Sequence, residues 1–158
     1  MACLRPLRSS DLAQVVAVYR DAVLSQAVGL YTQEQIDAWG EHACRDPALR
    51  EALLRGHGLA SCAENDDTII EAFALLEPDD RLSLLYCRGR ASRQGRGRAL
   101  VQALEQESRR RGCQRIRTEA SQLSRPLLLR LGWRVESEET LRFAGVWFSR
   151  WRMIKDLV

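Results

Sequence analysis

The chain has 158 residues, of which 46% are hydrophobic and 28% charged, and its formal net charge is +3. This length and composition are typical of one soluble globular domain, so we expect residues 1–158 to form a single domain. No stretch approaches the roughly 18 apolar residues of a membrane span, and the first residues lack the apolar run of a signal peptide. We therefore expect a cytoplasmic protein with no membrane segment.

The five cysteines are scattered along the chain and include no C-x-x-C pair. Their odd number and spacing argue against both a disulfide framework and a thiolate metal site, and favour reduced thiols in a cytosol. His42 and His57 have no neighbouring ligands at metal-binding spacing. We therefore expect no metal.

The basic residues are almost all arginine, because Lys155 is the only lysine among 24 basic positions. The 21 acidic residues are interleaved with them along most of the chain, which indicates a mixed solvated surface and no nucleic-acid partner. Two segments are locally basic, 88–98 and 109–111. The second is most simply the solvated end of a predicted helix, where its charge opposes the helix dipole.

The first half of the chain predicts a strand, three helices and an antiparallel pair of strands. Apolar residues recur at helical spacing in three segments, and each segment begins with residues suited to a helix start: Ser10-Asp11, Thr32 or Pro47. Gln35 stands three residues after Thr32, which is the spacing of a capping box. The predicted elements are a strand around 3–6, a helix from 12 to about 24, a helix after Thr32, a helix from 47 to about 54, and strands 59–63 and 68–76.

The second half alternates strands and helices and ends in a hairpin. The segment 82–87 is too apolar for an edge strand in solvent, so we expect it to be central. Gly112 and Gly132 stop the two helices. The predicted elements are strand 82–87, helix 99–111, strand 115–120, helix 126–131, and strands 133–135, 141–144 and 146–154. This order indicates an α/β or α+β fold with one mixed sheet covered by helices on both faces.

A turn rich in arginine and glycine follows the central strand, with the sequence Arg93-Gln94-Gly95-Arg96-Gly97-Arg98-Ala99. It places backbone N–H groups at a helix N-terminus, and its glycines allow a ligand to approach closely. These amides and the helix dipole favour a pyrophosphate, to which Arg93, Arg96 and Arg98 can add charge-assisted hydrogen bonds. The dinucleotide fingerprint and the nucleotide P-loop are both absent. We therefore expect a different phosphorylated cofactor here.

The turn resembles the Q/R-x-x-G-x-G/A signature of the GNAT N-acetyltransferase superfamily through Gln94-Gly95-Arg96-Gly97-Arg98-Ala99. Other segments resemble further family motifs in the correct order, so the resemblance covers nearly the whole chain. They are Leu4-Arg5-Pro6 at the opening, Leu84-Leu85-Tyr86-Cys87 at the cofactor strand, Ser124-Arg125-Pro126 through Gly132-Trp133 at the later helix, and Arg152-Met153-Ile154-Lys155 at the last strand. The resemblance implies a GNAT-like fold: about seven strands in a mainly antiparallel sheet with a central parallel pair, and helices on both faces.

The resemblance also implies acetyl-CoA as co-substrate. The backbone of the cofactor strand would pair with the pantetheine arm, the turn would wrap the pyrophosphate, and Glu119-Ala120-Ser121 would border the thioester. Ser124 and Leu128 would lie near the cofactor's sulfur. The implied cofactor-binding residues are Leu85, Tyr86, Cys87, Arg93, Gln94, Gly95, Arg96, Gly97, Arg98, Ala99, Ser124 and Leu128.

The activity that the resemblance implies is direct transfer of an acetyl group, in a ternary complex, to a primary amine of a small molecule or protein. Many family members place a tyrosine, as the acid, four residues before the helix-ending glycine, but this chain has Leu128 there. Tyr86 or Ser121 are candidates to hydrogen-bond the leaving sulfur instead, and a thiolate can also depart unaided. Glu71, a charge inside a predicted strand, is a candidate general base.

Each of these candidates has a structural alternative: a core aromatic for Tyr86, a helix cap for Ser121 and a solvated strand face for Glu71. Cys87 lacks an activating neighbour and is interpreted as a packing residue. Tyr31 and Trp39 are candidates for the wall of an acceptor pocket or for the core. The missing tyrosine leaves open a non-catalytic acyl-CoA-binding or regulatory module. Neither the acceptor nor the choice between monomer and homodimer can be read from a motif.

Overall fold

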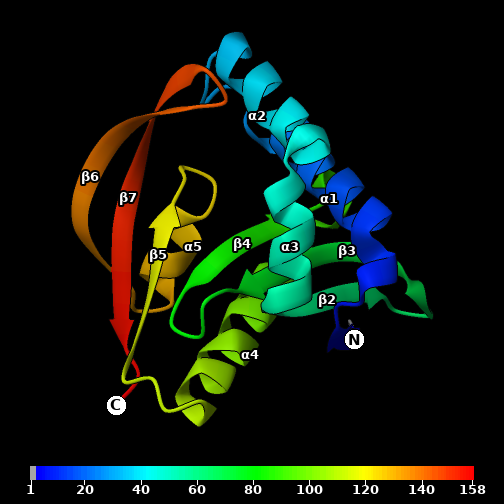
Figure 1. Ribbon diagram of the computed structural model, residues 1–158, viewed down its shortest axis with the longest axis vertical. Coiled ribbons are helices and arrows are strands. Elements are labelled where there is room, and N and C mark those ends of the chain that lie inside the picture. The colour runs from blue at the N-terminus through cyan, green and yellow to red at the C-terminus, as the bar shows by residue number, and fades with distance from the viewer. Residues whose placement is uncertain (1–2) are drawn as a thin grey trace.

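The computed structural model describes residues 3–158, in which seven strands form two antiparallel sheets (Figure 1). The first sheet has the strand order β1-β2-β3-β4 and the second the order β5-β7-β6. The strands are β1 (Cys3–Pro6), β2 (His57–Ala63), β3 (Asp66–Leu76), β4 (Leu82–Cys87), β5 (Arg115–Ala120), β6 (Arg134–Phe143) and β7 (Val146–Asp156). The predicted α/β class, with about seven mainly antiparallel strands, is confirmed, but the strands form two sheets and not the single mixed sheet that was expected.

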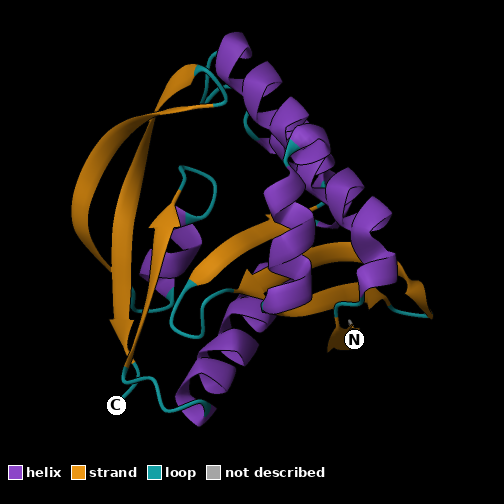
Figure 2. Cartoon of the chain, in the orientation of Figure 1, coloured by secondary structure: helices purple, strands orange, loops and turns teal. Residues whose placement is uncertain are grey.

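Five α-helices accompany the sheets in this part of the chain (Figure 2). They are α1 (Leu12–Gln26), α2 (Gln33–Arg45), α3 (Pro47–Arg55), α4 (Arg96–Arg110) and α5 (Arg125–Arg130). Side chains of β3 point alternately to the two faces of the first sheet, so Phe73 packs with α1 and α2 while Ala72 and Ala74 pack with α4. The helices therefore cover both faces. None of the described helices is long and apolar enough to cross a membrane.

The predicted helix starts differ in outcome. Thr32 and Gln35 form the expected capping box, since each backbone N–H donates to the other residue's side chain, at 3.2 and 2.9 Å. Ser10 and Asp11 instead belong to a short 3-10 helix (Ser9–Asp11), and the Asp11 carboxylate binds the Arg5 guanidinium at 2.8 and 3.0 Å. Asp11 does stand at the N-cap position of α1, but its side chain makes no capping hydrogen bond there, because the ion pair with Arg5 occupies the carboxylate.

Two predicted boundaries also change. The helix expected from 99 begins at Arg96, because Gly95 takes the left-handed conformation (φ +81°) and turns the chain into the helix three residues earlier. The strands expected at 133–135 and 141–144 are one strand, β6, whose mostly exposed middle pairs along β7. The middle of β6 lacks an apolar pattern, and its strand conformation is instead held by backbone pairing with β7.

The predicted central parallel pair is reduced to one isolated parallel bridge, beside which a few hydrogen bonds join the two sheets. β4 and β5 meet at an isolated parallel bridge, Arg81 with Arg117, and the Thr118 hydroxyl donates to the Leu82 carbonyl at 2.6 Å. Beyond this point the two strands diverge, as Figure 1 shows. The gap between them is the feature of the fold that positions the site.

Candidate active site

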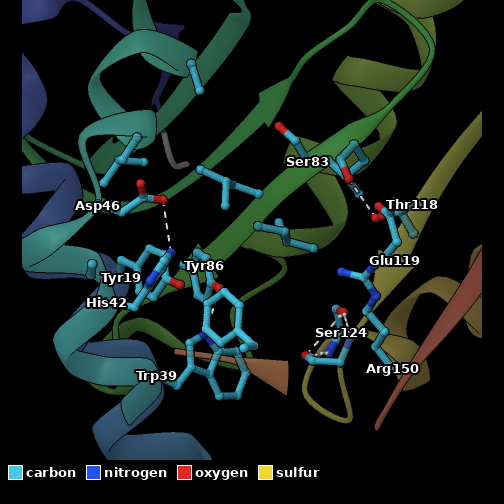
Figure 3. Close-up of a pocket in the computed structure, with 18 of the residues that line it drawn as sticks. Tyr19, Trp39, His42, Asp46, Ser83, Tyr86, Thr118, Glu119, Ser124 and Arg150 are labelled. Carbon is cyan, nitrogen blue, oxygen red and sulfur yellow. Dashed lines mark hydrogen bonds and ion pairs between the residues drawn. The ribbon is translucent and has the colours of Figure 1, made fainter. Parts of the chain in front are cut away.

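A cavity of about 520 Å³ lies where the two sheets diverge. Its lining residues come from β4, β5 and α5 and also from α2, α3, β6 and β7. Figure 3 shows the labelled lining side chains in two groups, with Trp39, His42 and Tyr86 in one, and Glu119 and Arg150 in the other. The cavity therefore joins segments that are far apart in the sequence.

Six aromatic side chains line this cavity: Tyr19, Tyr31, Trp39, Tyr86, Phe143 and Phe148. They contact one another in a continuous network, mostly edge to face. The Trp39 ring centroid lies 5.2 Å from that of Tyr31, 6.3 Å from Tyr86 and 6.1 Å from Phe148. Tyr31 and Trp39, the predicted candidates for the acceptor wall, are thus both at the cavity and both part of the adjoining core.

The Tyr86 hydroxyl lies inside this aromatic group. Trp39 Nε1 donates to Tyr86 Oη at 3.1 Å, and the Tyr19 ring stacks on the Tyr86 ring with centroids 4.1 Å apart. Burial raises the pKa of Tyr86 well above its usual value. The phenol is therefore neutral, and its hydroxyl both accepts from Trp39 and hydrogen-bonds with the Tyr19 hydroxyl.

The open edge of β4 faces the gap between the sheets. The Arg88 N–H donates to the Glu71 carbonyl of β3 at 2.8 Å, so the backbone groups of Leu85 and Cys87, at alternating positions, point to the opposite edge. The Cys87 carbonyl at this edge accepts from Gln26 Nε2 at 2.6 Å. Tyr86 pairs with Phe73 of β3. Leu85 and Cys87 thus present backbone groups to the gap, whereas Tyr86 presents its side chain to the cavity.

Cys87 is a packing residue in the structure. Burial raises the pKa of its thiol to about 11, and its side chain packs against the second core cluster. It is not among the residues that line the cavity. A thiol in this state is not a nucleophile at neutral pH.

Ser121, Ser124 and Leu128 all line the cavity. Ser121 Oγ accepts from the backbone N–H groups of Leu123 and Ser124, at 3.1 and 3.3 Å, and so closes the turn before α5. Its hydroxyl proton is not used by these two bonds. Leu128 is 1% exposed and brings an apolar surface to the place where the family resemblance expects a tyrosine.

Glu71 lies away from the cavity lining. Both of its carboxylate oxygens accept from Arg90, at 3.0 and 2.7 Å, and this pairing holds the pKa of Glu71 below its usual value. A carboxylate bound on both oxygens outside the cavity is poorly placed to act as a base there. The structure does not bring Glu71 together with Tyr86 and Ser121.

Glu119 of β5 is one of the carboxylates that line the cavity, just beyond the point where β4 and β5 part. Arg81 Nε donates to Glu119 Oε2 at 2.9 Å, and Oε1 makes no hydrogen bond with any residue of 3–158. The resemblance placed this residue beside the thioester without giving it a role. The alternation of β5, in which Thr118 and Ala120 are buried around it, is the signal that assigns the Glu119 side chain to the opposite face.

Sequence reasoning also missed His42 and Asp46, which line the cavity from the end of α2. His42 Nε2 lies 2.9 Å from Asp46 Oδ2, and the imidazole packs on Phe143 with ring centroids 4.4 Å apart. The spacing of four residues was the available signal, since it places both side chains on one side of a helix. No cluster of three or more metal-ligating side chains occurs within residues 3–158.

The predicted pyrophosphate turn leads into the first turn of α4. Arg93 (φ +59°) and Gly95 (φ +81°) are both left-handed, and the first helical hydrogen bond runs from the Ala99 N–H to the Gly95 carbonyl. The N–H groups of the three residues before Ala99 therefore have no partner within the helix. The side chains of Arg93 and Arg98 are exposed and make no hydrogen bond or ion pair with any other described residue.

Arg96 differs from its neighbours. It is buried, and its Nη1 donates to the Ser61 hydroxyl and the Cys62 carbonyl of β2, both at 2.9 Å. The prediction that Arg96 adds a hydrogen bond to the pyrophosphate is not supported by this orientation, since the guanidinium fastens α4 to the first sheet. Arg96 Nε also donates to the side-chain oxygen of Gln94, at 3.5 Å.

The model of a family described as an acetyltransferase (GNAT) domain matches residues 28–155. The chain belongs to the GNAT acetyltransferase family. Its match includes the turn, the gap between the strands and the cavity, so the enzyme class implied by the resemblance is confirmed. No curated protein matches this GNAT acetyltransferase.

Solved structures of the same fold resemble this GNAT chain over almost its whole length. A GCN5-related N-acetyltransferase from Rhodopseudomonas palustris has a TM-score of 0.91 at 24% identity, covering 99% of this chain and 96% of that one. The PaiA N-acetyltransferase from Thermoplasma acidophilum, solved with coenzyme A, has a TM-score of 0.76 at 18% identity and 99% coverage of both chains. YncA from Salmonella typhimurium, solved with acetyl-CoA, has a TM-score of 0.65 at 22% identity, covering 100% and 95%. At these low identities, the TM-scores show that the fold is shared.

Proposed function

We propose that this protein is an acetyl-CoA-dependent N-acetyltransferase that transfers the acetyl group directly to a primary amine in a ternary complex. The observation that carries the proposal is the divergence of β4 from β5, which leaves a backbone edge open beside a cavity large enough for two reacting groups. Two relatives of the same fold were solved with coenzyme A or acetyl-CoA. The reduced cysteines favour action in the cytoplasm.

In this proposal the cofactor runs along the gap between the strands. Its pyrophosphate binds at the N-terminus of α4, where the first-turn amides and the exposed Arg93 and Arg98 supply donors and positive charge. The pantetheine arm pairs with the backbone of Leu85 and Cys87 as an added strand would. The thioester then lies beside Ser124 and Leu128.

The proton donor to the departing sulfur is Tyr86 or Ser121 in this proposal. Both line the cavity, and in this proposal the hydroxyl turns from its present partner, Tyr19 for Tyr86 and Ser124 or Tyr31 for Ser121, to the sulfur. The acceptor nitrogen attacks the thioester carbon, a tetrahedral intermediate forms, and the carbon–sulfur bond breaks as the sulfur gains its proton. Tyr86 suits this role because its burial keeps the phenol neutral.

The proton acceptor in this proposal is Glu119, in place of Glu71. Its free oxygen, Oε1, is available to hold the acceptor nitrogen and take its proton, while Arg81 fixes the other oxygen. The acceptor enters from the side of α2 and α3, opposite the cofactor. Both substrates are then bound before any bond breaks, so no acetylated enzyme is formed.

The decisive experiment measures thermal unfolding with acetyl-CoA and CoA release with a panel of primary amines. At 100 times its Kd, acetyl-CoA stabilises a protein that binds it by about 2.7 kcal/mol, so a clear rise in Tm is expected. CoA should be released only when an amine is present, and initial rates should fit a sequential rather than a ping-pong pattern. No rise in Tm, or parallel lines in the two-substrate kinetics, would contradict the proposal.

A further inference from the structure

We propose that the acceptor is a cationic arylalkylamine without a carboxylate, bound with its ring against the aromatic wall of the cavity. This inference rests on the proposed function and adds the chemical class of the acceptor. The aromatic wall means the six rings already described, of Tyr19, Tyr31, Trp39, Tyr86, Phe143 and Phe148.

The aromatic wall provides the surface that an aryl ring needs. Three of its rings come from the segment that contains α1 and α2, and three come from strands β4, β6 and β7. The rings contact one another around Trp39 and Phe148. Ring centroids 5–6 Å apart in edge-to-face contacts define the geometry that a further aromatic ring extends. An aliphatic chain would also bury apolar surface there, but it would make no edge-to-face contact with the rings.

The charges at the cavity select against a negatively charged acceptor. Each of the three arginines that line it within residues 3–158 already has a carboxylate partner: Arg55 pairs with Glu51, Arg81 with Glu119, and Arg150 with Glu139. A carboxylate on the acceptor would have to compete with Glu51, Glu119 or Glu139 for these cations. The cavity therefore offers no unpaired arginine to the α-carboxylate of an amino acid.

The carboxylates at the same cavity favour a cation. Glu77 lines it and makes no ion pair with any described residue, and Glu119 keeps one oxygen free. An ammonium group that enters the cavity meets these oxygens before it loses its proton. An aryl ring at one end and an ammonium at the other thus match the two parts of the lining that Figure 3 separates.

The experiment compares kcat/KM for four amines with saturating acetyl-CoA. The set contains 2-phenylethylamine, phenylalanine as the same skeleton with a carboxylate, 2-cyclohexylethylamine as the same skeleton without an aromatic ring, and spermidine as a flexible polycation. We expect 2-phenylethylamine to exceed 2-cyclohexylethylamine by about threefold to tenfold, the value of an aromatic pair. It should exceed phenylalanine by on the order of a hundredfold, since an unpaired buried charge costs more.

Variants of the aromatic wall test whether those rings cause the preference. Trp39→Leu should lower the ratio between the phenyl and cyclohexyl amines toward one, and the half-buried Phe143→Leu provides the same test with less risk to the core. Trp147→Leu is the matched control, since this tryptophan is 59% exposed and lies outside the cavity lining. The ratio should not change in that variant.

The outcomes separate the two proposals. If acetyl-CoA raises the Tm but phenylalanine, spermidine or the cyclohexyl amine reacts as fast as 2-phenylethylamine, the acceptor class is wrong and the acetyltransferase proposal stands. Acetyl-CoA binding with no turnover of 2-phenylethylamine overturns the acceptor class as well. A protein that acetyl-CoA does not stabilise contradicts the proposed function itself.

Discussion

Arg81 Nε donates to Glu119 Oε2 at 2.9 Å, across the point where β4 and β5 part. The bond fixes the Glu119 side chain at the cavity, and the nearby hydrogen bond from Thr118 to the Leu82 carbonyl holds the two strands together beneath it. Because Arg81 binds only one oxygen, the pair positions the carboxylate without using all of its capacity to accept protons.

We predict that Glu119→Gln lowers kcat by a factor of about 10² to 10⁴, the usual contribution of a general base. The amide of the glutamine can still accept from Arg81, so the fold and acetyl-CoA binding should change little. Steady-state kinetics and the acetyl-CoA-induced shift in Tm check both statements.

The matched control for this prediction is Glu71→Gln. Glu71 is bound on both oxygens by Arg90 and lies outside the cavity lining, so this variant should keep its turnover. If Glu71→Gln lost as much kcat as Glu119→Gln while acetyl-CoA binding stayed normal, Glu71 would be the base after all.

The three arginines of the turn should separate into two groups. Arg93→Gln and Arg98→Gln should each weaken acetyl-CoA binding about tenfold at low salt and less at high salt, because exposed charges are screened. Arg96→Met should instead destabilise the fold by about 3 kcal/mol, since it leaves the buried Ser61 hydroxyl and Cys62 carbonyl without their donor. Titration calorimetry and urea unfolding measure the two effects. Equal losses of affinity without loss of stability in all three variants would refute this division.

The sequence predicted the turn but not the direction of each arginine. Glycines, strand order and helix caps are local features, and they were enough to place the predicted pyrophosphate turn between β4 and α4. The burial of Arg96 depends on Ser61, 35 positions earlier in the chain, and no local pattern encodes that contact. The same holds for Glu71, whose partner Arg90 lies 19 positions later in the chain, after β4.

The cavity shows the same limit. Trp39 and Tyr31 were recognised as aromatic residues that either wall a pocket or fill a core, and in the structure they do both. Phe143 and Phe148 entered only as strand residues, because the approach of the β6–β7 hairpin to α2 is a long-range event. Sequence spacing predicted where the cofactor binds, whereas the residues of the cavity wall depend on the packing of the two sheets.

We predict that Gly97→Ala weakens acetyl-CoA binding by about tenfold and leaves the Tm of the free protein nearly unchanged. A Cβ at this position would lie 3.1 Å from Leu127 Cδ2, the end of a flexible side chain that can shift by a few tenths of an ångström. The methyl group would occupy the helix N-terminus where the pyrophosphate approaches.

Gly95→Ala is the contrasting variant: its surroundings are open, but at φ +81° it should lose about 1 kcal/mol of stability. Unchanged affinity in Gly97→Ala would refute the pyrophosphate site.

The ion pair between Arg5 and Asp11 predicts a pH-dependent stability that is separate from the active site. Both side chains are buried and joined by two hydrogen bonds, which lower the pKa of Asp11 below its usual value. A carboxyl group with a lowered pKa in the folded state contributes stability above its unfolded pKa, near 4, and loses that contribution as pH falls through the folded value. Asp11→Asn should therefore destabilise the protein by about 3 to 5 kcal/mol at pH 7, because it leaves a buried guanidinium without its partner.

Urea unfolding at pH 7, 5 and 3 measures the free energy of unfolding of both proteins. The difference between them should be unchanged at pH 5 and smaller at pH 3. A difference that stays constant down to pH 3 would mean that packing, rather than the charge on Asp11, is responsible.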